Sequence, residues 1–166
     1  MSEIVLRPAT PDDADALSAL IAASYATLRD GAYDPASIDA ALPAMSHANP
    51  KLLASGTYYV AEIDGRAAGC GGWSFEAPSS GDREDGIAHI RHFAAHPDFR
   101  RQGVAHRLLK HCLAEAARNG AKVMRSQATL PAEPFYAKAG FRRVRTVEVQ
   151  IGPAMIPAID MERALP

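Results

Sequence analysis

The sequence has few cysteines and almost no net charge. Its two cysteines, Cys70 and Cys112, are too few for a disulfide framework or a zinc knuckle, and they indicate a reducing compartment. Lysine and arginine number 18 against 19 aspartates and glutamates, which gives a formal net charge of -1. A general nucleic-acid-binding surface needs clustered excess Lys and Arg, so this balance argues against a nucleic-acid partner.

Long hydrophobic runs are also absent. No apolar stretch approaches the roughly 20 residues that a membrane span needs. Residues 1–13 lack the basic and apolar regions of a signal peptide, so we expect a cytoplasmic protein with no membrane partner. The 166 residues, 48% of them hydrophobic, are typical of one compact domain over residues 1–166.

Hydrophobic periodicity predicts a mixed α/β domain. Strands are expected at residues 3–7, 57–63, 66–76, 87–95, 121–128, 141–151 and 156–163. Helices are expected at residues 12–26, within 36–54, and at 104–119 and 132–139, with a loop from 25 to 35. The dipeptide Asp64-Gly65 predicts a hairpin. In the return strand, Gly69, Gly71 and Gly72 indicate a bend or a close backbone approach.

The most informative stretch is FAAHPDFRRQGVAHRLL, residues 93–109. A predicted strand enters a basic turn that opens directly into the strongest predicted helix. Backbone N–H groups at a helix N-terminus lack intrahelical partners, so a phosphate placed there gains several hydrogen bonds at once. Gly103 allows close backbone approach, and Arg100 and Arg101 add positive charge. The alternative to a phosphate site is an ordinary helix start whose arginines are exposed.

Two motifs in this order resemble those of the GNAT superfamily, the CoA-dependent N-acetyltransferases. Arg100-x-x-Gly103-x-Ala105 is similar to the Q/R-x-x-G-x-G/A signature, and AEPFYAKAGF, residues 132–141, resembles the helix with a tyrosine before a Gly-Phe pair. The resemblance implies a mixed, mostly antiparallel central sheet, with helices on both faces and a splayed parallel strand pair.

The resemblance further implies that acetyl-CoA binds as a cosubstrate between strands around 93–95 and 123–128. Backbone groups of the first strand would pair with pantetheine, and N–H groups of the following turn would bind the pyrophosphate. An N–H near Ala95 would stabilise the oxyanion. The residues expected to bind the cosubstrate are Phe93, Ala94, Ala95, Arg100, Arg101, Gln102, Gly103, Val104, Ala105, His106, Thr129 and Tyr136.

An amine must lose a proton before it attacks a thioester, because a free alkylammonium has a pKa of about 10. By resemblance, Tyr136 lies where family tyrosines meet the CoA sulfur and is the general-acid candidate; core packing is its alternative. His89 stands at the strand position where many members carry a glutamate, and is the base candidate. Glu84, Asp85, Glu76 and solvent are competing proton acceptors.

Six histidines raise the question of a metal site, which their spacing does not favour. His89 and His92 are an odd number of residues apart on one strand and are predicted to point to opposite faces. His106 and His111 lie about 140° apart around a helix. We therefore expect no metal.

The sequence thus predicts an N-acetyltransferase that moves an acetyl group from acetyl-CoA to a primary amine of a small molecule or peptide, by direct attack in a ternary complex. A non-catalytic acyl-CoA-binding or sensing domain and an acyltransferase for a longer acyl chain are the alternatives. Dimers through the C-terminal strands are common in the family, so the resemblance is also compatible with a homodimer.

The resemblance implies that the acceptor is selected by the segment at about 25–55 and the loop at 76–86. Tyr25, Tyr33 and Asp34 are candidates to face it. Trp73 and Phe75 are expected to be packing residues; by resemblance their strand borders the cleft, so one of them is also a candidate to line the acceptor pocket.

Overall fold

The computed structural model describes residues 3–166, and a seven-stranded sheet forms its centre. The strands follow the order β1-β2-β3-β4-β5-β7-β6. Their bounds are β1 (Ile4–Pro8), β2 (Tyr58–Ile63), β3 (Arg66–Ser74), β4 (Ile87–Ala95), β5 (Val123–Thr129), β6 (Arg142–Ile151) and β7 (Ala154–Ala164). Within the described residues β4 and β5 are parallel and the other neighbours antiparallel, which confirms the expected sheet.

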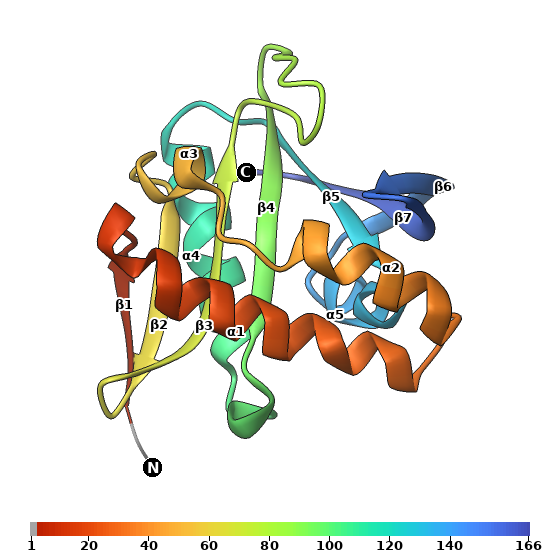
Figure 1. Cartoon of the computed structure of the whole chain (residues 1–166). Helices are drawn as coiled ribbons and strands as arrows, with labels where there is room; N and C mark the ends of the chain where they lie inside the picture. The colour runs from red at the N-terminus through yellow and green to blue at the C-terminus, as the bar shows by residue number, and fades with distance from the viewer. Residues whose placement is uncertain (1–2) are drawn as a thin grey trace.

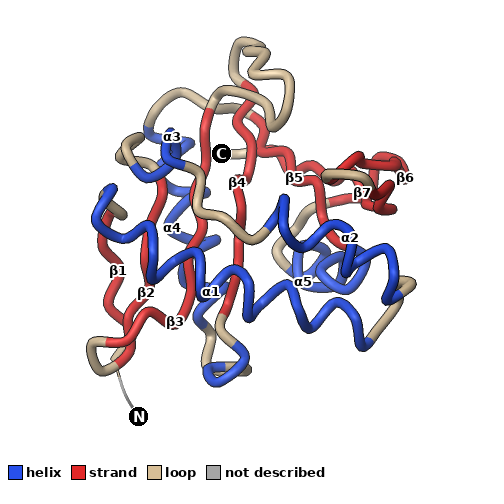
Figure 2. Tube along the Cα trace, in the orientation of Figure 1, coloured by secondary structure: helices blue, strands red, loops and turns tan. Residues whose placement is uncertain are grey.

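Helices cover both faces of this sheet, as expected (Figure 1). On the front face in Figure 1 lie α1 (Ala14–Ala26), α2 (Pro35–Met45) and the short α3 (Pro50–Leu53). Behind the sheet lie α4 (Val104–Arg118) and α5 (Glu133–Lys138). In Figure 2 the loop that joins β3 to β4 extends beyond the end of the sheet.

The apolar stripe predicted for residues 104–119 is buried as expected. Its members, which include Leu108, Leu109 and Cys112, pack in one core cluster with Ala88 and Ile90 of β4. On the other face Leu17 and Ile21 of α1 form a second cluster with strand residues. Burying one leucine side chain contributes about 1.5–3 kcal/mol, so these two clusters fix α4 and α1 against opposite faces.

Two local predictions need correction. The stretch 25–35 is not wholly a loop, because α1 continues to Ala26 and a 3-10 turn follows at Thr27–Asp30. The helical stretch 36–54 divides into α2 and α3. Pro43 lies inside α2, whereas Pro50 begins α3, where a missing N–H carries no penalty.

The parallel pair separates soon after it begins. Residues Ile87–His89 of β4 pair with Val123–Arg125 of β5, and no pairing of β4 with β5 extends further. The rest of β5 is held by β7 along Val123–Thr129. An opening is therefore left between the second halves of β4 and β5.

A bulge in β4 accompanies this separation. Arg91 pairs with Gly72 and Ala94 with Cys70, so His92 and Phe93 together stand opposite Gly71. A Cβ on Gly71 would overlap the Phe93 ring, which explains why this position of β3 is glycine. The expectation of a close backbone approach at these glycines is confirmed.

Candidate active site

A cavity of about 300 Å³ lies where β4 and β5 separate; we refer to it as the inter-strand cavity. It is lined by β4, β5, the C-terminal part of α1 and the start of α5. Among the residues predicted to bind the cosubstrate, six meet here: Phe93, Ala94, Ala95, Ala105, Thr129 and Tyr136. Positions from well-separated parts of the chain are thus brought around one space.

The β4 bulge changes which way its side chains face. Before the bulge Ala88 and Ile90 pack toward α4, whereas Ala94 beyond it packs with α1. The φ of His92 is +50°, and its side chain lies on the side of α1 and α2. The prediction that His89 and His92 point to opposite faces is therefore wrong, because it assumed an unbroken alternation.

Two tyrosines from other elements hold the bulge. The Tyr58 hydroxyl donates to the His92 carbonyl oxygen at 2.6 Å. The Tyr25 hydroxyl donates to the Phe93 carbonyl oxygen at 3.1 Å. Both carbonyls belong to the residues that share the position opposite Gly71, so these bonds fix the bulged backbone beside the cavity.

Tyr136 lies at the cavity wall with its side chain 5% exposed. Its ring packs edge-on against Phe141, with 5.3 Å between ring centroids. Burial raises the pKa of Tyr136 to about 12, and the neighbouring Ser126 hydroxyl opposes part of this rise. The phenol is therefore protonated at neutral pH and available as a hydrogen-bond donor.

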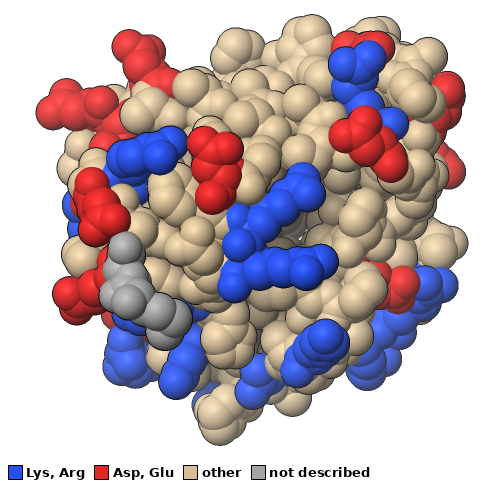
Figure 3. All heavy atoms as spheres, turned by 90° about the horizontal axis from the view of Figure 1, so that it is seen from below, with Lys and Arg blue, Asp and Glu red and all other residues tan. Residues whose placement is uncertain are grey.

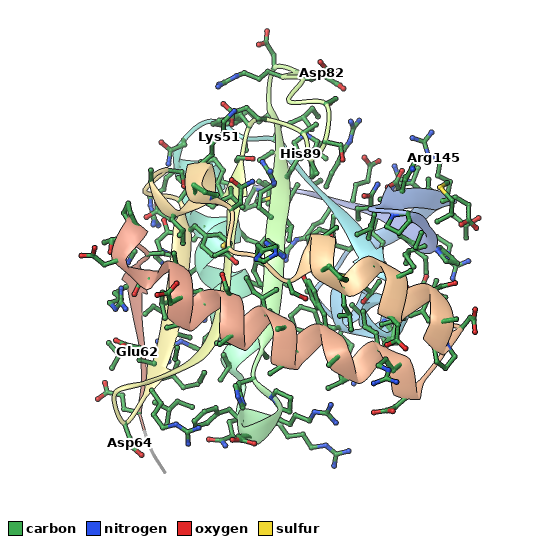
Figure 4. The ribbon with its side chains drawn as sticks, in the orientation of Figure 1. Lys51, Glu62, Asp64, Asp82, His89 and Arg145 are labelled. Carbon is green, nitrogen blue, oxygen red and sulfur yellow. The ribbon has the colours of Figure 1, made fainter. Side chains whose placement is uncertain are left out.

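His89 occupies a neighbouring pocket rather than the inter-strand cavity. It lies on the paired half of β4, opposite Arg125, toward the loop that carries Asp82 (Figure 4). Burial, together with Arg125 and Arg91, lowers the pKa of His89, whereas Glu84 raises it. Its ring is neutral at pH 7, yet it lines none of the cavity that holds Tyr136.

His92, which the sequence analysis considered only as a metal ligand, has a more central position. It lines the inter-strand cavity and also a second pocket of about 270 Å³ between β4, α2 and the β6–β7 arm, here called the α2-side pocket. Its ring lies 5.6 Å from that of Tyr25. Burial lowers the pKa of His92, as does Arg91, and a bond to the Met45 backbone raises it.

The hydrogen bonds of His92 define its tautomer. Nε2 lies 3.2 Å from the Met45 carbonyl oxygen. A carbonyl oxygen only accepts, so Nε2 carries the proton and Nδ1 is left as an acceptor. Within residues 3–166 His92 Nδ1 has no hydrogen-bond partner, and it is not fully buried, so it is free to accept a proton.

The competing carboxylates lie away from both spaces. Glu84 pairs with Arg125 at 3.4 Å and Glu76 with Arg83 at 2.8 Å. Asp85 lines a separate polar pocket with Glu84. None of the three lines the inter-strand cavity or the α2-side pocket.

The turn before α4 has the free donors that an anion needs. Within the described residues the backbone N–H groups from Arg101 to His106 have no acceptor, and the first intrahelical cap bond runs from Arg107 N–H to the Gly103 carbonyl. Arg101 and Gly103 adopt φ values of +61° and +80°. Alternating backbone conformations of this kind aim successive N–H groups at one point.

This turn is exposed and positively charged. Arg100, Arg101, Gln102 and Gly103 are all exposed, and neither arginine pairs with a described carboxylate. The turn lies at the lower end of the sheet in Figure 1. Figure 3 views that face, where Lys and Arg side chains gather at the centre beside a hollow. The His106 side chain instead faces a pocket against the last residues of the chain.

The acceptor candidates divide into two groups. Tyr25 and Tyr33 line the α2-side pocket, although the Tyr33 hydroxyl is fully used by the Pro157 carbonyl and the Leu130 N–H. Asp34 precedes α2 and is exposed. Trp73 and Phe75 line neither space; they pack edge-on against each other in the core cluster, as the packing interpretation predicted.

Sequence reasoning missed several polar residues of these spaces, among them two on β5 and one on β4. Ser126 and Gln127 of β5 line the inter-strand cavity, and Arg91 lines the α2-side pocket. A small polar residue within a buried strand was a usable signal for Ser126. Arg91 gave no signal, because the pocket that it lines is formed by elements far apart in the sequence.

Two further observations bear on metals and membranes. Within residues 3–166 no three His, Cys, Asp or Glu side chains come together in a way that could hold a metal ion. No helix among these residues is long and apolar enough to cross a membrane.

Comparisons with solved structures show the same fold over almost the whole chain. A GCN5-related N-acetyltransferase from Rhodopseudomonas palustris is 22% identical, with a TM-score of 0.80 over 99% of this chain and 98% of its own. PaiA N-acetyltransferase from Thermoplasma acidophilum, solved with coenzyme A, is 16% identical, with a TM-score of 0.71 over 98% of this chain and 99% of its own.

A third similar structure is the N-acetylglutamate synthase from Neisseria gonorrhoeae, solved with coenzyme A and N-acetyl-glutamate. It is 17% identical, with a TM-score of 0.65 over 100% of this chain and 36% of its own. At such identities these likenesses show the fold alone. A search of curated proteins found no match.

The family itself is shown by the sequence model of the acetyltransferase (GNAT) domain, which matches residues 54–143, more than half of the chain. This range contains β4 with its bulge, the turn with free N–H groups, and most of the inter-strand cavity. The chain belongs to the GNAT superfamily of acetyltransferases.

Proposed function

We propose that this protein transfers an acetyl group from acetyl-CoA to a primary amine by direct attack in a ternary complex. The observation that carries the proposal is the run of unbonded backbone N–H groups from Arg101 to His106, next to a cavity lined by Phe93, Ala95 and Tyr136. Such donors suit a pyrophosphate, and the open strand edge beside them suits a pantetheine chain.

The binding residues have distinct roles in this proposal. N–H groups of the turn hold the pyrophosphate, while Arg100 and Arg101 add positive charge beside it. Backbone groups of Phe93, Ala94 and Ala95 extend the strand edge toward pantetheine. Thr129, at the end of β5, lies across the cavity from them. Bound there, acetyl-CoA supplies an activated thioester carbonyl.

Three groups then serve the transfer itself. A base removes the proton from the incoming ammonium, because the protonated amine has no lone pair for attack. A backbone N–H of β4 near Ala95 stabilises negative charge on the carbonyl oxygen. Tyr136 donates a hydrogen bond to the departing sulfur. The amine enters from the α2-side pocket, whose wall includes His92 and Thr129.

His92 is better placed than His89 to be the base. Its Nδ1 is an unprotonated acceptor without a hydrogen-bond partner among the described residues, and the residue borders both the cavity with Tyr136 and the α2-side pocket. The residues facing it are Arg91 on its own strand, Tyr25 on α1 and Met45, whose carbonyl lies at the end of α2. No described carboxylate contacts it to raise its pKa.

We expect His92→Gln to lower kcat at pH 7 by roughly 10–100-fold, within the usual loss for a missing base. Glutamine retains an N–H for the Met45 carbonyl but cannot accept a proton. Neutral histidine is the active form and its pKa lies below 6.5, so the wild-type kcat should fall only below that pH. In the variant kcat should instead keep rising toward pH 9 as more free amine forms.

The matched control is His89→Gln, which changes the other neutral histidine of β4. Its kcat–pH profile at saturating acceptor should retain the wild-type acidic limb. If His89→Gln loses that limb and His92→Gln keeps it, His89 is the base, as the strand position alone predicted.

The function itself is tested by CoA release from acetyl-CoA with a set of amines, measured beside CoA binding by calorimetry. We expect acceptor-dependent release of CoA. Tight CoA binding with no release for any amine would favour the non-catalytic acyl-CoA-binding domain. Competition between acetyl-CoA and longer thioesters tests the acyl-chain alternative.

A further inference from the structure

The α2-side pocket has an unusual charge distribution for an enzyme that accepts amines. No aspartate or glutamate lines it. Its walls are mainly apolar and aromatic, with Leu28, Met45 and Ile156 among them. Arg91 supplies the one formal charge of its lining at neutral pH, since burial lowers the pKa of His92.

Arg91 is half-buried and forms no ion pair with a described carboxylate, although Glu76 lies near enough to raise its pKa against the lowering by burial. Its Nη1 donates to Ser74 Oγ at 2.8 Å and to the Glu76 carbonyl oxygen at 3.3 Å, which orients the guanidinium. Within residues 3–166 its Nε and Nη2 donors make no hydrogen bond, and neither atom is fully buried. The carboxylate of Glu76 is held by Arg83 at 2.8 Å and lies outside the pocket.

A partly desolvated guanidinium with free donors favours an anion, and its planar fork matches a carboxylate in a bidentate arrangement. The β4 bulge determines what lies next to that anion. Consecutive strand residues normally face opposite sides, but the bulge turns His92 to the side that Arg91 already faces, so both line the same pocket. An anion site and a proton acceptor are therefore neighbours.

We infer that the acceptor is an α-amino acid with an apolar side chain, whose carboxylate binds Arg91 and whose amine lies at His92. This inference rests on the proposed acetyl transfer and names the substrate class of the same site. The apolar walls receive the side chain of the acceptor. A polyamine or an aminoglycoside would bring several positive charges into a pocket that contains an arginine and no carboxylate.

The first test compares each acid with its own neutral analogues in the wild-type protein. Leucine and phenylalanine are measured against leucinamide and phenylalaninamide, and against the decarboxylated amines. We expect kcat/KM for the acids to exceed that for the amides at least about 10-fold, the effect of one charged hydrogen-bonding group. The amine of an amino acid amide has a lower pKa than the amine of the acid, so at a given pH more of the amide is in the reactive free-amine form. The supply of free amine therefore cannot produce a preference for the acid.

The second test assigns the preference to Arg91. Arg91→Met, which removes the charged guanidinium but keeps an unbranched flexible stem, should bring the acid-to-amide ratio close to one. Arg91→Lys should give an intermediate ratio, because a point charge replaces the fork. The control is Arg29→Met, which removes an exposed arginine paired with Asp39 at 2.9 Å and should leave the ratio at its wild-type value.

Each outcome has a definite meaning. Equal rates for acids and amides, or faster acetylation of polyamines, would overturn the inference while leaving acetyl transfer intact. A ratio that survives in folded Arg91→Met would remove Arg91 from acceptor binding. If no amine releases CoA, the proposed function fails, and calorimetry of acids against amides on CoA-saturated protein still decides whether the pocket selects a carboxylate.

Discussion

Replacing Gly103 with glutamate is expected to abolish CoA binding in a protein that still folds. The backbone N–H groups around Gly103 are free, and a phosphate at this turn would lie beside any side chain placed there. A carboxylate at this position repels the phosphates and occupies their space. We expect the Kd for CoA, measured by calorimetry, to rise by at least about 100-fold.

The fold should tolerate this change at a modest cost. A Cβ at Gly103 meets no atom within 4 Å, so the cost comes from its φ of +80° alone. A left-handed conformation costs an ordinary residue roughly 1–2 kcal/mol. Thermal unfolding of the variant therefore checks that any loss of affinity does not come from loss of structure.

Two control variants separate charge, bulk and strain. Gly103→Gln has the shape of the glutamate variant without its charge, and should weaken binding much less. Gly120→Glu places the same carboxylate at the other end of α4, where φ is +95° and the space is also open. CoA affinity should be unchanged in Gly120→Glu. Unchanged affinity in folded Gly103→Glu would show that the pyrophosphate does not bind at this turn.

The order of strands and helices was predictable from the sequence because it depends on local signals. Alternating or periodic apolar residues, Asp64-Gly65 and Gly103 each act over a few neighbouring positions. The turn before α4 is also local: a strand, a glycine and a helix follow one another within residues 93–109. Its free N–H groups follow from helix geometry.

The β4 bulge was not predictable in the same way, since its causes are distant in sequence. The bulged residues stand opposite Gly71, and the hydroxyls of Tyr58 and Tyr25 hold their carbonyls. These contacts join β4 to β2 and to α1. A strict two-residue alternation therefore gave His92 the wrong face, so its position beside Arg91 in the α2-side pocket was not foreseen.

The bulge also determines which residues lie close enough to the inter-strand cavity to take part in the chemistry. Because β4 and β5 separate beyond His89, a group on the paired half of β4 lies farther from the inter-strand cavity than one on the bulged half. Tyr136 approaches the same cavity from α5, across from the bulge. A proton acceptor and a proton donor can thus act on opposite sides of one thioester.

Tyr136→Phe is expected to lower turnover by roughly 10–100-fold with little change in CoA affinity. The substitution keeps the ring that packs against Phe141 and removes the hydroxyl alone. Since burial raises the pKa of Tyr136 to about 12, the phenol stays protonated throughout the useful pH range, and the loss should be the same at pH 6 and pH 9. A loss of turnover that does not change with pH distinguishes Tyr136→Phe from a variant that lacks the base, whose loss depends on pH.

The raised pKa also indicates how Tyr136 acts. A thiol has a pKa of about 8.5, so complete proton transfer from a phenol of pKa about 12 to a thiolate is uphill. The main contribution is then a hydrogen bond that strengthens as charge develops on sulfur, which places the expected loss at the lower end of general-acid effects.

Tyr59→Phe, which removes the hydroxyl of a buried tyrosine outside the cavity, is the control and should retain normal turnover. Single-turnover rates at saturating acetyl-CoA report the chemical step without product release, so a rate within twofold of wild type in Tyr136→Phe would leave this tyrosine with a packing role alone.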